Sequence, residues 1–239
     1  MIVTVHQPHF LPWLGYLHRM AQADLFVILD HVQFERRNYQ NRTMIRLGGE
    51  ARWLTVPVEQ RSQKERIDEK RIDNSLHGTP RWWSPGHFQT IRQAYRDAPF
   101  IGEYAPALRR IFETRRERLV ELNAALLELL RDAFGIRTRL VRSSELNVEG
   151  AKSELILNLC RAVGADSLLA GLGGSRHYLD KATFERAGVR ILYQDFEHPV
   201  YPQCGAAPFS KGLSSIDMLL NCGAASGDLL RKEKIRVAA

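Results

Sequence analysis

The sequence predicts an α/β fold: a five-stranded, mainly parallel sheet with helices on both faces and a helical insertion between its third and fourth strands. Three segments carry this prediction, because each has a helical pattern that ends in glycine before a short β-rich run. The glycines are Gly135, Gly164 and Gly188, and the runs cover residues 138–141, 167–170 and 189–193. Glycine closes the last helical turn in a left-handed conformation, and short apolar strands entered in this way are typical of parallel βα units. The predicted arrangement is therefore Rossmann-like.

The N-terminal half begins with the same alternation of strand and helix. Residues 2–6, 25–29 and 53–58 have the apolar character of strands, and residues 14–23 read as a short helix. Residues 61–71 are charged and poor in apolar side chains, which predicts a surface loop or a mobile lid. From Trp82 to Phe134 the chain is expected to be mostly helical, with apolar residues from Leu108 to Leu130 at helical spacing. We expect residues 1–239 to form a single domain, with residues 60–135 as a mostly helical insertion or cover.

Composition indicates a globular protein with an anionic partner. The 239 residues are 44% hydrophobic and 26% charged, and no apolar run approaches the roughly 20 residues of a transmembrane helix. The first residues lack the basic flank of a signal peptide, and three cysteines without metal-type spacing fit a reducing compartment, so a cytoplasmic location is expected. A net charge of +7 favours anionic partners. The arginines of residues 109–118 fit a solvated helix face, or a contact with RNA, an acidic membrane or a phosphorylated substrate.

The segment from His6 to Tyr16 is the strongest candidate for a functional site. Ligands of doubly wound sheets bind beyond the carboxyl ends of the strands, where the strand order reverses, and the first strand delivers His6 there. Two prolines stiffen the loop that follows, and Gly15 opens a helix whose amides could hold an anion. Asp30 and Gln33 end the second strand and are expected at the same crevice. The alternative is that these histidines are ordinary hydrogen-bonded residues and Trp13 belongs to the core.

Further polar clusters follow the other strands. Arg42, beside Asn41, presents a planar fork suited to phosphate or carboxylate, although a plain surface loop is an equal reading. A glycine-rich turn after residues 167–170 is typical of an anion cradle, but it is neither the dinucleotide fingerprint nor a P-loop. It contains Gly173, Gly174, Ser175, Arg176, His177 and Tyr178.

A last cluster follows the final strand and includes His198, Tyr201 and Gln203. Histidine titrates near neutral pH, so we predict that His6 or His198 transfers protons, with Asp30 as a third catalytic candidate. His6, His9, His177 and His198 could together bind a metal ion, but their spacing is scattered and no pair lies on one helix. We therefore predict no metal site.

These motifs, taken in order, resemble the WbqC-like protein family. The matching segments run from the first strand to residue 217: they are residues 6–16, 30–34, 40–42, 53–58, 173–178, 198–203 and 213–217. Members of that family are found with genes for O-antigen and other surface-glycan synthesis, and a glycine transferase role has been suggested for one. The resemblance thus implies transfer of an amino-acyl or acyl group, glycyl included, to a sugar nucleotide or glycan precursor. The substrate-binding candidates are Gln7, Gln33, Asn41, Arg42, His177, Tyr178, Tyr201 and Gln203.

A second resemblance is to the nucleotidylyltransferase and pantothenate synthetase superfamily, whose members bind ATP over a His-x-Gly-His turn. The corresponding residues here are Trp13-Leu14-Gly15-Tyr16, so both histidines are missing, and His6, His9 or His18 would have to replace them. The sequence leaves the cofactor open, and ATP with magnesium is the candidate that this resemblance implies. The cofactor-binding candidates are His9, Gly15, Gly173, Gly174, Ser175, Arg176, Ser214 and Ser215.

Three hypotheses of function follow. The first is the group-transfer enzyme, with an anionic small molecule or a nucleotide as substrate and an adenylate or an aminoacyl-tRNA as donor. The second is an ATP-dependent adenylating ligase or nucleotidyltransferase, for which magnesium-dependent release of pyrophosphate is the discriminating observation. The third is a non-catalytic protein that binds nucleotides or RNA. The sequence does not specify the donor, the acceptor or the oligomeric state.

Overall fold

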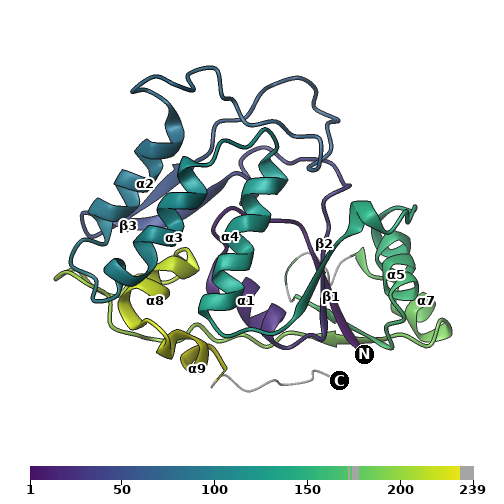
Figure 1. Cartoon of the computed structure of the whole chain (residues 1–239). Helices are drawn as coiled ribbons and strands as arrows, with labels where there is room; N and C mark the ends of the chain where they lie inside the picture. The colour runs from purple at the N-terminus through teal and green to yellow at the C-terminus, as the bar shows by residue number, and fades with distance from the viewer. Residues whose placement is uncertain (172, 174–177, 232–239) are drawn as a thin grey trace.

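A computed structural model describes residues 1–171, 173 and 178–231 of the chain (Figure 1). Its main sheet has five strands in the order β5-β2-β1-β6-β7, and every neighbouring pair is parallel. The strands are β1 (Ile2–His6), β2 (Leu25–Ile28), β5 (Arg139–Arg142), β6 (Ser167–Ala170) and β7 (Arg190–Tyr193). The predicted α/β fold with a five-stranded parallel sheet is therefore confirmed.

Helices cover both faces of this sheet (Figure 1). One face carries α5 (Lys152–Ala162) and α7 (Lys181–Arg186). The other side carries α1 (Leu14–Ala21), α4 (Leu119–Ala133), α8 (Ser215–Cys222) and α9 (Ala225–Arg231). Strand β2 shows why both faces are apolar: Val27 packs in the cluster with α5, and its neighbours Phe26 and Ile28 pack in the cluster with α1 and α4. Alternate side chains of a strand face opposite ways, so one strand contributes to both cores.

The glycine prediction holds at all three helix ends. Gly135, Gly164 and Gly188 have φ angles of 61°, 69° and 72°, the left-handed region that a side chain with a Cβ rarely adopts. Each lies just beyond a helix, α4, α5 and α7 respectively, and shortly before a strand of the main sheet. These three turns place β5, β6 and β7.

One predicted strand lies outside the main sheet. Residues 53–58 overlap β4 (Glu50–Thr55), which pairs antiparallel with β3 (Arg42–Leu47) in a separate two-stranded sheet. The physical reason is the exposure of this strand. Five of the six residues of β4 are exposed, whereas a strand inside a parallel sheet is covered on both faces. The insertion into the main sheet thus runs from β2 to β5, and it contains the hairpin as well as helices.

Helices α2 (Trp83–Ala94) and α3 (Ile101–Glu113) precede α4 within that insertion. The charged segment of residues 61–71, predicted as a surface loop or lid, is anchored at its second half. Ile67 and Lys70 are buried, and the Asp68 backbone N–H donates to the Asp30 carbonyl at 2.8 Å. Lys70 forms a buried ion pair with Glu65 at 2.7 Å. Residues 61–64, Arg66 and Glu69 are exposed, whereas the other residues of the segment are buried or half-buried, so its second half packs against the protein.

A search of the helices in the described part of the chain finds none whose length and apolarity would allow it to span a bilayer.

Candidate functional site

The strand order reverses between β1 and β6. The chain runs outward from β1 to β2 and β5, and then returns to β6 and β7 on the opposite side. His6 is the last residue of β1 and Ala170 the last of β6, so both lie at the edge where ligands of such sheets bind. Gly173 and Tyr178 are exposed beyond β6. The predicted contributions of Gly174, Ser175, Arg176 and His177 fall outside the described residues.

A row of aromatic rings connects the end of β1 to the hairpin. The His6 and His9 ring centroids are 4.6 Å apart, and His9 stacks on Tyr39 at 5.5 Å. Tyr39 contacts Trp53 at 5.6 Å, and the guanidinium of Arg42 lies 4.1 Å from the centre of the Trp53 ring. We call these five residues the ring row. Three segments that are separated in sequence thus form one continuous series of ring contacts.

The two histidines of the ring row have different chemistry. Nδ1 of His6 lies 2.9 Å from the Gln7 carbonyl, which can only accept, so this nitrogen carries a proton, and in the neutral ring Nε2 is the acceptor. The His6 residue is half-buried. His9 is buried, and this burial lowers its pKa to about 3. It therefore stays neutral, and it supports His6 rather than exchanging protons.

The loop around the ring row is fixed by amides. Gln7 accepts a hydrogen bond from Gln40 Nε2 at 2.9 Å, and Asn41 donates to the Val56 carbonyl at 2.9 Å. Tyr16 packs against His6 at 4.6 Å, and burial raises the pKa of its hydroxyl. Gln33 is exposed, and its side chain donates to the Gln63 carbonyl at 2.7 Å. Gln7 and Asn41 therefore position the backbone of the site.

A hollow of about 280 Å³ adjoins Arg42. Its walls include three arginines, two amides and three less polar side chains: Arg36, Arg37, Arg42, Asn41, Gln60, Phe34, Thr55 and Val58. We call it the arginine pocket.

Asn41 and Arg42 were predicted to bind substrate, and the structure brings both to this pocket. Arg36, Arg37, Tyr39 and Trp53 were not predicted, because residues of an exposed loop and a hairpin carry no motif that separates them from ordinary surface.

Asp30 does not have the surroundings of a proton-transfer group. It is fully buried, and its two oxygens accept hydrogen bonds from Arg142 Nε at 2.6 Å, Ser143 Oγ at 3.0 Å, Ser144 N at 2.9 Å and Ser144 Oγ at 2.9 Å. Four donors occupy the lone pairs of both oxygens. Asp30 thus ties the end of β2 to the end of β5, and the catalytic role predicted for it stays a prediction.

His198 is also engaged within its own loop. The Gly212 N–H donates to Nε2 at 3.3 Å, and Nδ1 then carries the proton that reaches the Pro199 carbonyl at 2.9 Å. Burial lowers its pKa, which fits this neutral tautomer. The rings near it are those of Phe196, Tyr201 and Phe209. The structure thus does not bring His198 together with the ring row, and we do not assign it proton transfer.

Tyr201 and Gln203 belong to a buried polar network. Asp217 accepts from Tyr201 OH at 2.9 Å and from Gln203 Nε2 at 2.8 Å, and Arg46 Nη1 donates to Gln203 Oε1 at 2.8 Å. Asp217 is 0% exposed, and its burial raises its pKa. Gln203 therefore bridges a buried cation and a buried carboxylate, where substrate contact was predicted.

Three of the predicted cofactor-binding residues are buried in the protein interior: Gly15, Ser214 and Ser215. A Cβ on Gly15 would overlap the Trp13 indole, so the glycine allows that ring to lie over the start of α1. Ser214 caps α8 by accepting from the Ile216 N–H, and the Ser215 N–H donates to the Pro12 carbonyl at 2.8 Å. Both serines are buried. The structure therefore gives these three candidates packing roles instead of an open nucleotide cradle.

Arg19 of α1 is a feature that the sequence did not reveal. It is 6% exposed, its burial lowers its pKa to about 10, and its Nε has no hydrogen-bond partner among the described residues. Its guanidinium would collide with a Cβ on Gly171, just beyond β6. In sequence it looks like a routine basic residue in the last turn of a helix. In the fold its guanidinium lies against Gly171 just past the end of β6, and the strand order reverses between β6 and β1.

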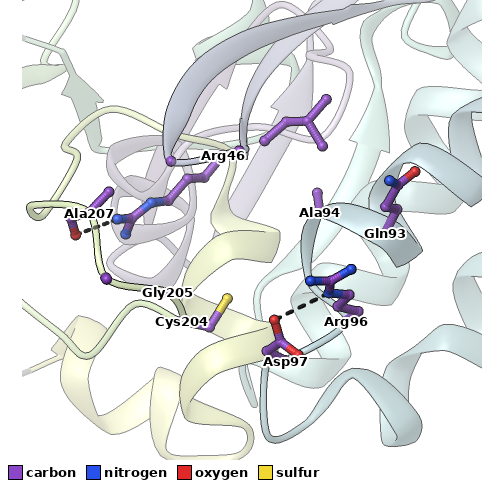
Figure 2. Close-up of a pocket in the computed structure, with 12 residues that line it drawn as sticks. Arg46, Gln93, Ala94, Arg96, Asp97, Cys204, Gly205 and Ala207 are labelled. Atoms are coloured by element: carbon purple, nitrogen blue, oxygen red, sulfur yellow. Dashed lines mark hydrogen bonds and ion pairs between the residues drawn. The ribbon is translucent and has the colours of Figure 1, made fainter.

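A larger cavity, about 600 Å³, lies elsewhere (Figure 2). It is enclosed by the turn between β3 and β4, the end of α2 and the loop of residues 204–207. Cys204 lines it, but burial raises the pKa of the thiol, so the nucleophilic thiolate is disfavoured. None of the residues predicted from the sequence to bind or react lines this cavity.

No group of three or more histidine, cysteine or acidic side chains with metal-binding geometry occurs among the described residues, which exclude His177.

A family model described as the WbqC-like protein family matches residues 7–228, a span that contains the arginine pocket and all of the ring row except His6. The chain belongs to the WbqC-like protein family. A relative from Mycobacterium tuberculosis (strain ATCC 25618 / H37Rv), named as the uncharacterized protein Rv1507c, is 31% identical over 231 residues, which cover 96% of this chain and 97% of the relative. No solved structure gives a significant match.

Proposed function

We propose that this WbqC-like protein is a group-transfer enzyme that attaches an amino-acyl or acyl group, glycyl included, to a sugar nucleotide or glycan precursor. The observation that carries the proposal is the ring row, which joins His6, whose Nε2 has no hydrogen-bond partner among the described residues, to a pocket rich in arginine. Surface-polysaccharide or related secondary metabolism is the setting that the family suggests.

The chemistry assigned to His6 is general base catalysis. The amine or hydroxyl of the acceptor attacks the acyl carbonyl carbon, and its proton passes to His6 Nε2 as the new bond forms. The leaving group takes the electron pair of the broken bond, and His6 can return the proton to it. Arg42 holds an anionic part of a substrate through its planar fork. Asp30 and His198 have no part in these steps, because their polar atoms already have partners.

An adenylating ligase or nucleotidyltransferase is the second candidate, supported by the position of β1 at the reversal of strand order. The Trp13 ring over Gly15 counts against it, because that glycine would have to lie open to phosphate. RNA binding by residues 109–118 has little support. Arg109 pairs with Glu113 at 2.7 Å and Arg115 with Glu117 at 2.7 Å, while Arg116 donates to the Ile111 carbonyl.

The test is a transfer assay read by mass spectrometry. The purified protein is incubated with magnesium ATP, single amino acids and a panel of nucleotide sugars, and in parallel with aminoacyl-tRNA as donor. A product heavier than the nucleotide sugar by one amino-acyl group is expected. His6→Ala should lower its rate by about 10²-fold or more, while His77→Ala, an exposed histidine outside the site, should not. Full activity of a folded His6→Ala protein would refute the assignment, and pyrophosphate release without transfer would favour the ligase.

A further inference from the structure

We propose that the arginine pocket binds the diphosphate group of a diphosphate-linked substrate, with the ring attached to that diphosphate stacked on Trp53. This inference rests on the proposed function, because it specifies which part of the sugar-nucleotide acceptor the site recognises. It assigns roles to Arg36, Arg37 and Trp53.

The charge of the pocket is unbalanced. Among the described residues, no carboxylate lies within 4 Å of the side-chain nitrogens of Arg36, Arg37 or Arg42, whereas nearby Arg52 and Arg61 pair with Glu50 and Glu59 at 2.5 and 2.6 Å. Glu35, the adjacent acid, instead accepts a hydrogen bond from Asn38 Nδ2 at 2.5 Å. Three guanidinium groups around one hollow repel each other, and an anion of two or more charges relieves that repulsion.

The geometry of Arg42 fits a planar, bidentate contact. Its guanidinium carbon lies 4.1 Å from the centre of the Trp53 ring, a cation–π contact that helps to hold the planar fork in place. One of its N–H groups donates to the Arg37 carbonyl, and Nε is a buried donor without a partner among the described residues. The Arg37 carbonyl is placed by a left-handed backbone with φ of 60°, which is unfavourable for a residue with a side chain. An outlier of this kind at a pocket is a recognised sign of a functional constraint.

The size of the pocket indicates which part of a substrate it holds. Sites for whole small-molecule ligands measure about 300–1,000 Å³, and about 280 Å³ is just below that range. The pocket therefore suits the charged group, and the rest of the ligand has to lie outside it. The Trp53 side chain is 45% exposed beside it, although large aromatic residues are usually buried. Its ring, with Tyr39 next to it, offers a platform for a base or sugar and leads back along the ring row to His6.

The larger cavity fits this ligand less well. Its buried arginine, Arg46, already donates to Gln203 Oε1 and to the carbonyls of Ala207 and Pro208. Its second arginine, Arg96, pairs with Asp97 at 3.4 Å (Figure 2). Arg96 therefore supplies the matched control: an arginine in a cavity, but with an acid beside it.

The experiment is isothermal titration calorimetry with four probes: inorganic phosphate, inorganic pyrophosphate, uridine diphosphate and uridine diphosphate glucose. We expect pyrophosphate to bind more tightly than phosphate. Arg42→Ala and Arg36→Ala should each weaken pyrophosphate binding by about tenfold or more, and Arg42→Lys should restore only part of it. Trp53→Ala should weaken binding of uridine diphosphate glucose and leave pyrophosphate nearly unchanged. Arg96→Ala should match the unaltered protein with every probe.

Two results would overturn the inference: absence of pyrophosphate binding, or an equal loss of binding in Arg96→Ala and Arg42→Ala. Arg36 is exposed and its side chain reaches only Gln60, so Arg36→Ala keeps the test valid if Arg42→Ala fails to fold. Because binding is measured without turnover, the inference and the proposed function fail separately. Amino-acyl transfer to an acceptor that lacks a diphosphate would refute the inference alone, and binding without any transfer would refute the function alone.

Discussion

Arg142 and Asp30 form an ion pair of 2.6 Å between the ends of neighbouring strands, with the carboxylate fully buried. The pair joins β5 to β2 at the edge of the sheet where the site lies, and the two serines that follow Arg142 complete the hydrogen bonding of the carboxylate. A buried charge that loses its partner is costly, so this contact is a structural element of the edge.

Asp30→Asn is therefore expected to lower the free energy of unfolding by about 2–4 kcal/mol, because Arg142 would face a neutral amide and one donor would lose its acceptor. Urea denaturation at neutral pH measures the change. Asp228→Asn is the control, since the exposed pair of Asp228 with Arg231 should contribute less than about 1 kcal/mol. If Asp30→Asn kept its stability and lost only transfer activity, the residue would be catalytic after all.

The packing of Trp13 over Gly15 leads to a second prediction. A methyl group on Gly15 would overlap the indole, and Trp13 also makes an edge-to-face contact with Phe196 at 5.5 Å between ring centroids. Gly15→Ala should therefore destabilise the fold by about 1–3 kcal/mol, as overpacking does. Gly102→Ala in α3 is the matched control, because that position has open space, and alanine there should stabilise the helix by up to about 1 kcal/mol. Thermal unfolding of the two variants should shift in opposite directions.

Arg46 provides a third prediction, at the wall of the large cavity. Its side chain is buried, and its removal would take three hydrogen bonds away: one of the two that Gln203 Oε1 accepts, and those to the carbonyls of Ala207 and Pro208. Arg46→Ala should cost about 3 kcal/mol, since hydrogen bonds from a charged donor contribute more than neutral ones. Arg52→Ala on the same hairpin, where the side chain is largely exposed, should change stability by less than about 1 kcal/mol. Equal melting temperatures of the two variants would contradict the network.

The sequence was sufficient for the sheet because its signals are local. Gly135, Gly164 and Gly188 mark helix ends whatever the rest of the chain does. Local signals do not determine in which sheet the strand of residues 53–58 lies. That depends on the strand with which β4 pairs, which is the adjacent β3. The same limit applies to the site. The sequence placed His6 at a strand end. It could not show that Arg142 donates to Asp30, or that the Gly212 N–H donates to His198. Tyr39 and Trp53 were missed because only the fold aligns their rings.

The fourth prediction concerns acid stability and His9. Its pKa in the folded protein is about 3 because of burial, against 6.5 for an exposed histidine. Between these values the unfolded chain binds more protons than the folded one, so stability is full above about pH 6.5 and falls as the pH drops towards 3. His9 alone should reduce the free energy of unfolding by about 2 kcal/mol between pH 7.5 and pH 5. His9→Phe keeps a ring to stack on Tyr39 but cannot take up a proton.

The measurement is urea denaturation of the unaltered protein, His9→Phe and His77→Phe at both pH values. His9→Phe should lose about 2 kcal/mol less than the unaltered protein on acidification, whatever its stability at pH 7.5. His77→Phe, which removes an exposed histidine, should retain the loss seen in the unaltered protein. His87 and His198 also have pKa values lowered by burial, so some acid sensitivity should persist in His9→Phe. Identical acid sensitivity in all three proteins would mean that His9 is accessible to protons in the folded state, and the neutral, supporting role assigned to it beside His6 would be wrong.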